Sequence, residues 1–143
     1  MVRPADDLRS TRTPVVLPGR HTALGSAAST PLMSDAISWS GLLFLSGRAA
    51  VDPATGKLRA TTFGEQLRIV LDDTLEVLAT AGSGPEHVLR VECWLRDRAD
   101  FAEWNGAYVG TFPPPRPART TLVADFPIEG LLVELQLTAS VPA

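Results

Sequence analysis

Cysteine and histidine are scarce in this sequence: Cys93 is the only cysteine, and His21 and His87 are the only histidines. A single cysteine excludes an intrachain disulfide and a cysteine-rich metal site. The two histidines are far apart in the sequence and have no partner at ligand spacing, so they give little basis for a metal site or a Ser-His-Asp triad. The sequence therefore predicts no bound metal, and a reducing compartment such as the cytoplasm fits.

Long apolar runs and an excess of positive charge are also missing. No run of about 18 uninterrupted apolar residues exists, and the first residues lack the apolar stretch of a signal peptide. We therefore expect a soluble, unexported protein with no membrane partner. The net charge of −3 disfavours nonspecific binding of nucleic acid, which draws its affinity from neutralisation of phosphates by Lys and Arg.

The chain is long and apolar enough for one core, with 143 residues of which 45% are hydrophobic. Residues 1–30 are rich in Pro, Arg, Ser, Thr and Ala and have no sustained apolar period, which predicts an irregular N-terminal arm. Residues 31–143 are then expected to form a single domain.

The first part of this domain predicts a hairpin, a turn and a helix. Residues 36–46 contain two short apolar runs around Ser40–Gly41, the pattern of two strands joined by a tight turn. Proline and glycine at favoured positions predict an exposed turn over Asp52–Gly56. Capping-box spacing predicts a helix that starts at Thr62, and Gly82 is its expected end. One face of this helix holds Leu67, Val70, Leu71, Thr74, Leu75 and Leu78.

The second part predicts strand, helix, strand, strand. Residues 87–95 alternate as a half-buried strand. Asp97 and Asp100 signal the start of a second helix, which ends before the proline run. Residues 118–125 and 131–139 are strand-like and are expected to pair as an antiparallel hairpin. The apolar stripe of the second helix consists of Phe101, Trp104, Tyr108 and Val109.

This order predicts an α+β sandwich of two layers, with two helices on one face of a mostly antiparallel sheet. The opposite face then stays uncovered, although 42–45 and 131–133 carry apolar residues on both sides. We expect another copy of the chain to cover that face, because most soluble assemblies are closed homo-oligomers. The alternative is that the N-terminal arm folds over it.

Arg119 and Glu134 are the residues with the clearest potential for chemistry. Arg119 opens a strand with a permanently charged, planar donor group that suits a carboxylate, although a solvated arginine at a strand end would give the same pattern. Glu134 interrupts an apolar run. If residues 118–125 and 131–139 pair, the partner of Arg119 falls in a window that includes Glu134. The two would form either an ion pair or a cleft in which Glu134 acts as base toward a water, and spacing does not decide. Cys93 is expected in the core.

Several segments together resemble the RidA family, also called YjgF/YER057c/UK114, over about residues 36–139. The most specific part is the RPAR-[ST] segment, which ends at Thr120, followed by Glu134 fifteen positions after Arg119. The segments that carry the resemblance are Leu45-Ser-Gly47, Val51-Asp-Pro-Ala-Thr-Gly56, Trp104-Asn-Gly-Ala-Tyr108, Arg116-Pro-Ala-Arg-Thr120 and Val133-Glu134.

The resemblance implies a homotrimer of a chorismate-mutase-like α+β fold, with a ligand cleft between adjacent subunits. It implies hydrolysis of reactive enamines or imines, such as 2-aminoacrylate, to 2-keto acids and ammonia without a cofactor. Arg119 matches the arginine that clamps the substrate carboxylate, and Glu134 matches the glutamate that positions or activates water. Gly47, Asn105 and Thr121 match further positions of the cleft lining.

The chain also departs from the family pattern. Leu32 or Met33 stands where the family has a tyrosine, and the usual SGQ appears as Ser46-Gly-Arg48, so that Arg48 is expected to add charge to the cleft. Thr121 replaces a common cysteine. The missing tyrosine supports an alternative, a noncatalytic trimer that binds a small carboxylate metabolite. A third alternative, RNA cleavage, is disfavoured by the acidic balance and the absence of a catalytic histidine pair.

Overall fold

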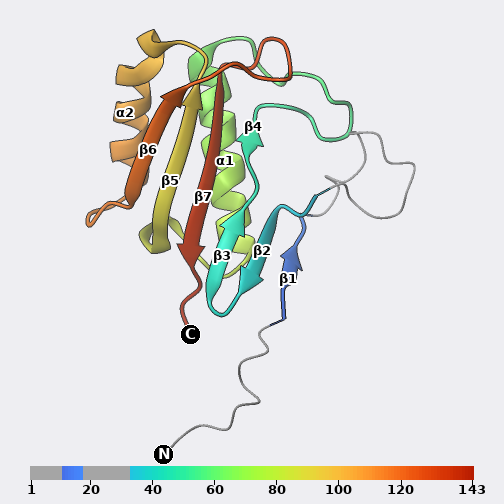
Figure 1. The fold of residues 1–143 in the computed structure, drawn as a ribbon, viewed down its shortest axis with the longest axis vertical. Helices are drawn as coiled ribbons and strands as arrows, with labels where there is room; N and C mark the ends of the chain where they lie inside the picture. Colours follow the sequence, from blue (N-terminus) through green and yellow to red (C-terminus); the bar gives the residue numbers. More distant parts are fainter. Residues whose placement is uncertain (1–10, 18–32) are drawn as a thin grey trace, which may run out of the picture.

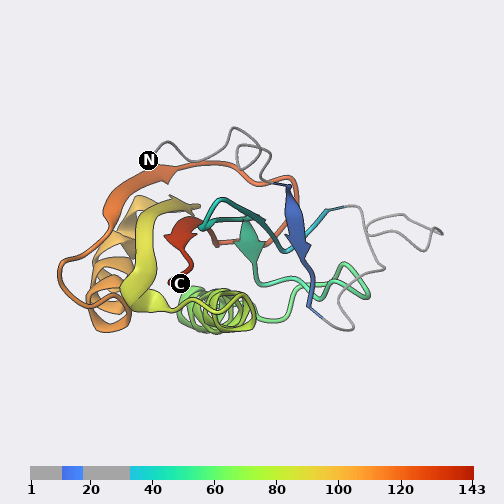
Figure 2. The ribbon, with the colours of Figure 1, turned by 90° about the horizontal axis from the view of Figure 1, so that it is seen from below.

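The computed structural model describes residues 11–17 and 33–143, which form a sheet covered by two helices on one face (Figure 1, Figure 2). The strands are β1 (Thr13–Val15), β2 (Ala36–Trp39), β3 (Leu42–Leu45), β4 (Arg48–Ala49), β5 (Val88–Leu95), β6 (Ala118–Val123) and β7 (Val133–Ser140). The helices are α1 (Phe63–Thr80) and α2 (Phe101–Thr111), with 3-10 turns at Pro85–His87 and Arg98–Asp100. The predicted two-layer α+β architecture is confirmed.

The sheet order is β1-β2-β3-β7-β5-β6, with β4 also paired to β7. All neighbours are antiparallel except β5 and β6, which are parallel. The predicted hairpin of residues 118–125 with 131–139 is therefore wrong. β6 lies at the edge of the sheet, and β5 separates it from β7, which lies in the middle. Parallel strands require a crossover, and α2 provides it between β5 and β6.

The N-terminal hairpin has the predicted form. Ala36 pairs with Leu45, and the turn residues Ser40 and Gly41 both have positive φ, 50° and 75°. Two successive positive φ values match the right-handed twist of the strands, and glycine adopts such a value without steric cost. The predicted turn over Asp52–Gly56 is also confirmed, since the Gly56 amide donates to the Asp52 carbonyl at 2.7 Å.

Helix α1 starts after Thr62 and ends before Gly82, as predicted, but its N-terminus is built differently. The Thr62 hydroxyl donates to the Glu65 carboxylate at 2.8 Å, and no side-chain bond caps a backbone amide. At the other end Gly82 has φ of 75°, and the Ser83 amide donates to the Leu78 carbonyl. Its buried face meets β4 and β7 and supplies a large part of the core.

Helix α2 has the predicted position but not the predicted stripe. Trp104 and Tyr108 are buried, whereas the side chains of Phe101 and Val109 are 43% and 54% exposed. Strand β5 shows a similar local departure: Val88 is buried and Leu89 is exposed, because the pairing with β7 shifts register between Val88 and Arg90. A bulge of this kind turns the next side chains to the opposite faces.

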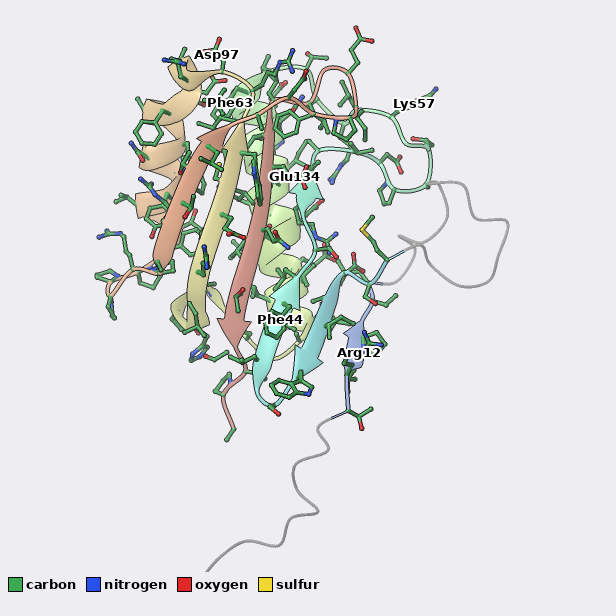
Figure 3. All side chains as sticks on the ribbon, viewed as in Figure 1. Arg12, Phe44, Lys57, Phe63, Asp97 and Glu134 are labelled. Atoms are coloured by element: carbon green, nitrogen blue, oxygen red, sulfur yellow. The ribbon has the colours of Figure 1, made fainter. Side chains whose placement is uncertain are left out.

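No helix within the described residues, 11–17 and 33–143, covers the face of the sheet opposite α1 and α2. Register places Ile37, Trp39 and Phe44 on this face, and the last two are each 44% exposed (Figure 3). We call it the open face. Within the arm, β1 pairs with β2 at the sheet edge, so the prediction of an irregular arm is wrong for Thr13–Val15. Residues 1–10 and 18–30 of the arm lie outside the described residues.

Gln66 fixes the loop that leads into β7. Its fully buried side chain donates to the carbonyls of Ala60 and Gly130 at 3.0 and 2.9 Å and accepts from the Leu132 amide at 2.9 Å. Gln66→Leu keeps the volume but leaves three backbone groups without this partner. We expect the free energy of unfolding to fall by about 2–4 kcal/mol, measured by urea denaturation. A loss below about 0.5 kcal/mol would contradict this role for Gln66.

Candidate active site

Arg119 lies on the helix side of the sheet edge. It is opposite Val91 of β5, a residue with no exposed surface that faces the helices. The Arg119 Nη1 donates to the Asn105 Oδ1 at 2.7 Å. Its guanidinium carbon is 4.7 Å from the centre of the Tyr108 ring and 5.8 Å from that of Phe101. The structure thus brings Arg119 and Asn105 together and holds an exposed cation against aromatic faces.

The surroundings of Arg119 tie helix α2 to strand β6. The Trp104 Nε1 donates to the Thr121 Oγ1 at 3.0 Å, and the Tyr108 hydroxyl donates to the Pro117 carbonyl at 2.9 Å. Thr121 therefore lies on the same side of β6 as Arg119, bonded to the helix. These contacts fix the ring of Tyr108 and so the direction in which the guanidinium points. Sequence patterning missed this role of Tyr108 and Phe101, because their helical spacing was interpreted as core packing.

Cys93 is buried next to this group and takes no part in it. Burial raises the pKa of the Cys93 thiol to about 12, and the charge of Arg119 opposes this only in part. The thiol therefore stays protonated near neutral pH and is a poor nucleophile. The prediction that Cys93 belongs to the core is confirmed.

Glu134 lies on the open face, opposite Ala49 of β4 and Trp94 of β5 (Figure 3). Its side chain is half-buried, and burial raises the pKa of its carboxyl above the ordinary value. The Glu134 carboxylate rests against Gly47, where an added Cβ would overlap Oε1 and lie 3.1 Å from Cδ. Gly47 and Glu134 are thus brought together, and only glycine leaves room for the carboxylate in this position.

Gly47→Ala is expected to move the Glu134 carboxylate with little effect on the fold. The methyl group meets the end of a flexible side chain, which rotates away at small cost. We expect a melting temperature within a few degrees of wild type and a lower pKa of the Glu134 carboxyl, because the displaced carboxylate is more hydrated. Ala49→Gly, two residues further along the chain in β4, serves as the control. An unchanged pKa of Glu134 in folded Gly47→Ala, followed by carbon-13 NMR, would contradict the contact.

Arg119 and Glu134 do not meet within one chain, which corrects the sequence-based expectation that they are neighbours. Arg119 of β6 pairs with Val91 of β5, which in turn pairs with Leu137 of β7. Arg119 is therefore two strands away from β7, at the level of Leu137, which is three residues after Glu134. This corresponds to about 10 Å across the strands and about 10 Å along them. The two side chains also point to opposite faces of the sheet.

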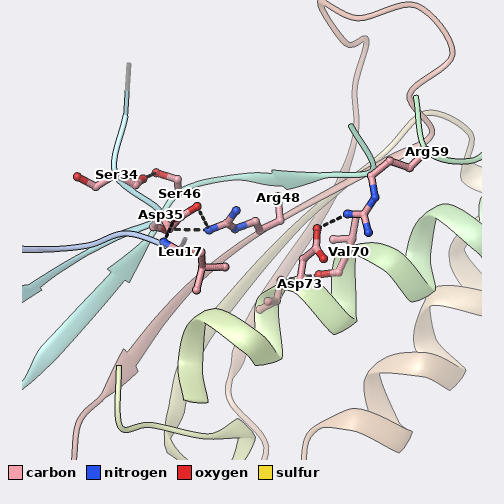
Figure 4. Close-up of polar contacts among 9 residues, drawn as sticks. Leu17, Ser34, Asp35, Ser46, Arg48, Arg59, Val70 and Asp73 are labelled. Carbon is pink, nitrogen blue, oxygen red and sulfur yellow. Dashed lines mark hydrogen bonds and ion pairs between the residues drawn. The ribbon is translucent and has the colours of Figure 1, made fainter. Parts of the chain in front are cut away.

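Arg48 and Met33 lie elsewhere. Arg48 is opposite Leu135, on the helix side, and its Nη2 is 2.6 Å from the Asp35 Oδ1 (Figure 4). The structure therefore brings Arg48 to Asp35 rather than to Glu134, and this partner was not foreseen from the sequence. The side chain of Met33 is 53% exposed, two residues before Asp35.

A pocket of about 310 Å³ lies in the loop between β6 and β7, lined by residues 125–132 and Arg96. Neither Arg119 nor Glu134 lines it. Among the described residues, no group of three His, Cys, Asp or Glu side chains is placed to hold a metal ion. Over the same residues, neither helix has both the length and the apolar character needed to span a membrane.

Comparisons with known proteins agree on one family. The family model described as Endoribonuclease L-PSP matches residues 24–141. Protein mmf2, mitochondrial, of Schizosaccharomyces pombe is 41% identical over 91 residues, which are 64% of this chain and 71% of the relative. Reactive Intermediate Deaminase A, chloroplastic, of Arabidopsis thaliana is 35% identical over 108 residues, which are 75% of this chain and 57% of the relative.

Solved structures give the same result. A YjgF-family protein from Neisseria meningitidis is similar with a TM-score of 0.70 and 33% identity, covering 80% of this chain and 92% of that one. The chorismate-mutase-like α+β fold is thereby confirmed. The match of the family model over most of the chain agrees with the motifs around Arg119 and Glu134. The chain therefore belongs to the RidA family, also called YjgF/YER057c/UK114.

Proposed function

We propose that the chain is a cofactor-independent deaminase of reactive imines and enamines such as 2-aminoacrylate. It works as a homotrimer in which Arg119 of one subunit and Glu134 of the next face the same cleft. Membership of the RidA family and the likeness to Reactive Intermediate Deaminase A support a general role with such intermediates. The placement of Arg119 and Glu134 on opposite faces of one sheet is the observation that carries the finer proposal.

A second copy resolves this separation. β6 is an edge strand with Leu122 and Val123 more than half exposed, and the open face carries Trp39 and Phe44 at 44% exposure. Exposed apolar surface of this kind is typical of an interface. If the β6 edge of one subunit lies along the open face of its neighbour, Arg119 approaches Glu134 from the outside. A closed ring of copies repeats this contact at every interface.

The chemistry follows from the two groups. The Arg119 guanidinium, oriented by Asn105 and the Tyr108 ring, binds the substrate carboxylate. Glu134 takes a proton from a water as the water oxygen bonds to the imine carbon, the electrons of the C=N double bond move to the nitrogen, and Glu134 passes the proton on to that nitrogen, which gives the neutral carbinolamine. Glu134 then takes the hydroxyl proton as the C=O bond forms and the C–N bond breaks, and it gives this proton to the leaving nitrogen, so that a 2-keto acid and ammonia result. An enamine first tautomerises to the imine.

Ammonia release tests the proposal. A serine or threonine dehydratase generates the enamine in situ, and the purified protein is added at increasing concentration. We expect ammonia to appear faster than by spontaneous hydrolysis, in proportion to the protein added. A rate equal to the spontaneous one at all concentrations would reject the deaminase.

The second candidate is a noncatalytic trimer that binds a small carboxylate. The absence of a tyrosine favours it: Leu32 or Met33 stands where the resemblance expects one, and Met33 is exposed. Calorimetry with 2-ketobutyrate distinguishes the two: binding without turnover supports the metabolite-binding trimer, and no binding removes it. RNA cleavage is less favoured, because the net charge is −3. Nuclease activity that survives in an Arg119→Ala, Glu134→Ala variant would indicate contamination. The cytoplasmic location stays a prediction, which fractionation tests.

A further inference from the structure

Arg48 and Asp35 form a buried ion pair beneath the open face. The Arg48 Nη2 is 2.6 Å from the Asp35 Oδ1, and the two side chains are only 12% and 11% exposed. The other carboxylate oxygen, Oδ2, accepts from the Leu17 amide at 2.6 Å. Both oxygens of Asp35 are thus engaged, which is the condition under which a buried charge is tolerated.

The two chain neighbours of Gly47, Ser46 and Arg48, both bond to the segment Ser34–Asp35 (Figure 4). The Ser46 amide donates to the Asp35 carbonyl at 3.0 Å, and the Ser46 hydroxyl donates to the Ser34 carbonyl at 2.7 Å. Arg48 reaches the Asp35 carboxylate from the other side of Gly47. Gly47 is therefore held between two residues that are both fixed to the segment Ser34–Asp35.

The position of Gly47 matters because the Glu134 carboxylate rests on it. Strand β4 consists of Arg48–Ala49 alone, so its pairing with β7 supplies few backbone hydrogen bonds to hold this region. We propose that Arg48 and Asp35 are a positioning pair, which holds the Gly47 backbone against Glu134 and so fixes the place and the burial of that carboxylate. This role rests on the proposed function of Glu134.

Charged residues on or just after the neighbouring strand β5 have ion-pair partners of their own. On β5, Glu92 faces the same side one rung away, where Arg90 contacts it at 3.2 Å. Just beyond β5, Arg96 forms an ion pair with Asp125. Ala49 of β4 and Gly47, just before this strand, lie beside Glu134 and carry no charge. A change at Arg48 therefore reaches Glu134 through the Gly47 backbone rather than through a shared ion pair on the open face.

The test uses a neutral pair, Asp35→Asn with Arg48→Gln, which keeps hydrogen-bonding groups at both positions and leaves no unpaired buried charge. The control is Arg59→Gln, which breaks an ion pair of the same 2.6 Å length between Arg59 and Asp73 (Figure 4). Turnover is measured against pH in the dehydratase-coupled assay. For the neutral pair we expect kcat to fall on the order of tenfold to a hundredfold with KM within about twofold.

The pH profile separates positioning from simple destabilisation. In the neutral pair, the Glu134 carboxyl is no longer held against Gly47 and becomes more hydrated. Its pKa then falls, so the acidic limb of the profile of kcat against pH moves to lower pH. Arg59→Gln is expected to lower stability and leave the limb in place. Arg48→Lys, which keeps the charge, is expected to restore part of kcat. A folded neutral pair with wild-type kcat and an unmoved limb would overturn the proposal.

A measurement independent of turnover distinguishes failure of this inference from failure of the proposed function. Carbon-13 NMR of labelled glutamate follows the titration of Glu134 in wild type, in the neutral pair and in Arg59→Gln, with Glu134→Gln assigning the signal. A lower pKa of Glu134 in the neutral pair alone supports positioning, even if no ammonia is released. An unchanged pKa rejects it, even if the protein is a deaminase.

Discussion

An Arg119→Ala variant is expected to lose on the order of a hundredfold to a thousandfold in kcat/KM, because a charge-assisted, two-pronged contact to the substrate carboxylate is removed. Most of the loss is expected in KM, since the carboxylate does not change charge during the reaction. Arg119 is exposed, so the melting temperature is expected to stay within a few degrees of wild type. Steady-state kinetics of ammonia release measure the effect.

Two control variants show whether the planar guanidinium of Arg119 or only its positive charge matters. Arg116→Ala removes the same charge from an exposed position three residues earlier and is expected to leave kcat/KM within about twofold. Arg119→Lys keeps the charge but loses the planar donor group and the contact with Tyr108, so it is expected to recover little. Equal losses in Arg116→Ala and Arg119→Ala would contradict a specific clamp.

Glu134→Gln is expected to lower kcat on the order of a hundredfold to ten-thousandfold with little change in KM, because glutamine cannot take the proton from water. The matched control is Glu92→Gln, which removes a carboxylate from the same face one rung away and is expected to keep kcat within about twofold. Wild-type kcat in Glu134→Gln would remove Glu134 from the mechanism.

The raised pKa of Glu134 gives this residue a second signature. A base acts in its ionised form, so the acidic limb of kcat against pH is expected above the ordinary glutamate pKa. Stability has the matching sign: the folded state binds this proton more tightly than the unfolded chain, so wild type loses stability as pH rises from the ordinary pKa through the raised one. Glu134→Gln is expected to lack that loss, as thermal melts across the window would show.

Local signals predicted the elements well, because each rests on a few adjacent residues. The positive φ at Ser40 and Gly41, the start of α1 after Thr62 and its end at Gly82 are all local properties of the chain. Arg119 and Glu134 were also identified from the sequence, Arg119 as a guanidinium at the start of a strand and Glu134 as a carboxylate within an apolar run. What these two residues contact was not a local property.

The pairing of β6 was the main error, and its reason is topological. Residues 124–132 form a connection long enough either to turn back as a hairpin or to cross a neighbouring strand, so its length did not decide. The order β5, α2, β6 was the available signal, since a helix between two strands is typical of a parallel crossover. Arg48 was misplaced for a related reason: in a strand of two residues, alternation gives too little pattern to assign a face.

The central claim, a site shared between subunits, is tested most directly by mixing two inactive variants. Arg119→Ala and Glu134→Gln are unfolded together, refolded as a one-to-one mixture, and assayed for ammonia release, with mixed oligomers verified by native mass spectrometry. If the site lies between chains, about a quarter of wild-type activity returns, because that fraction of interfaces joins an intact Arg119 to an intact Glu134. If mixed oligomers form and the activity stays at the level of the separate variants, the shared site is contradicted.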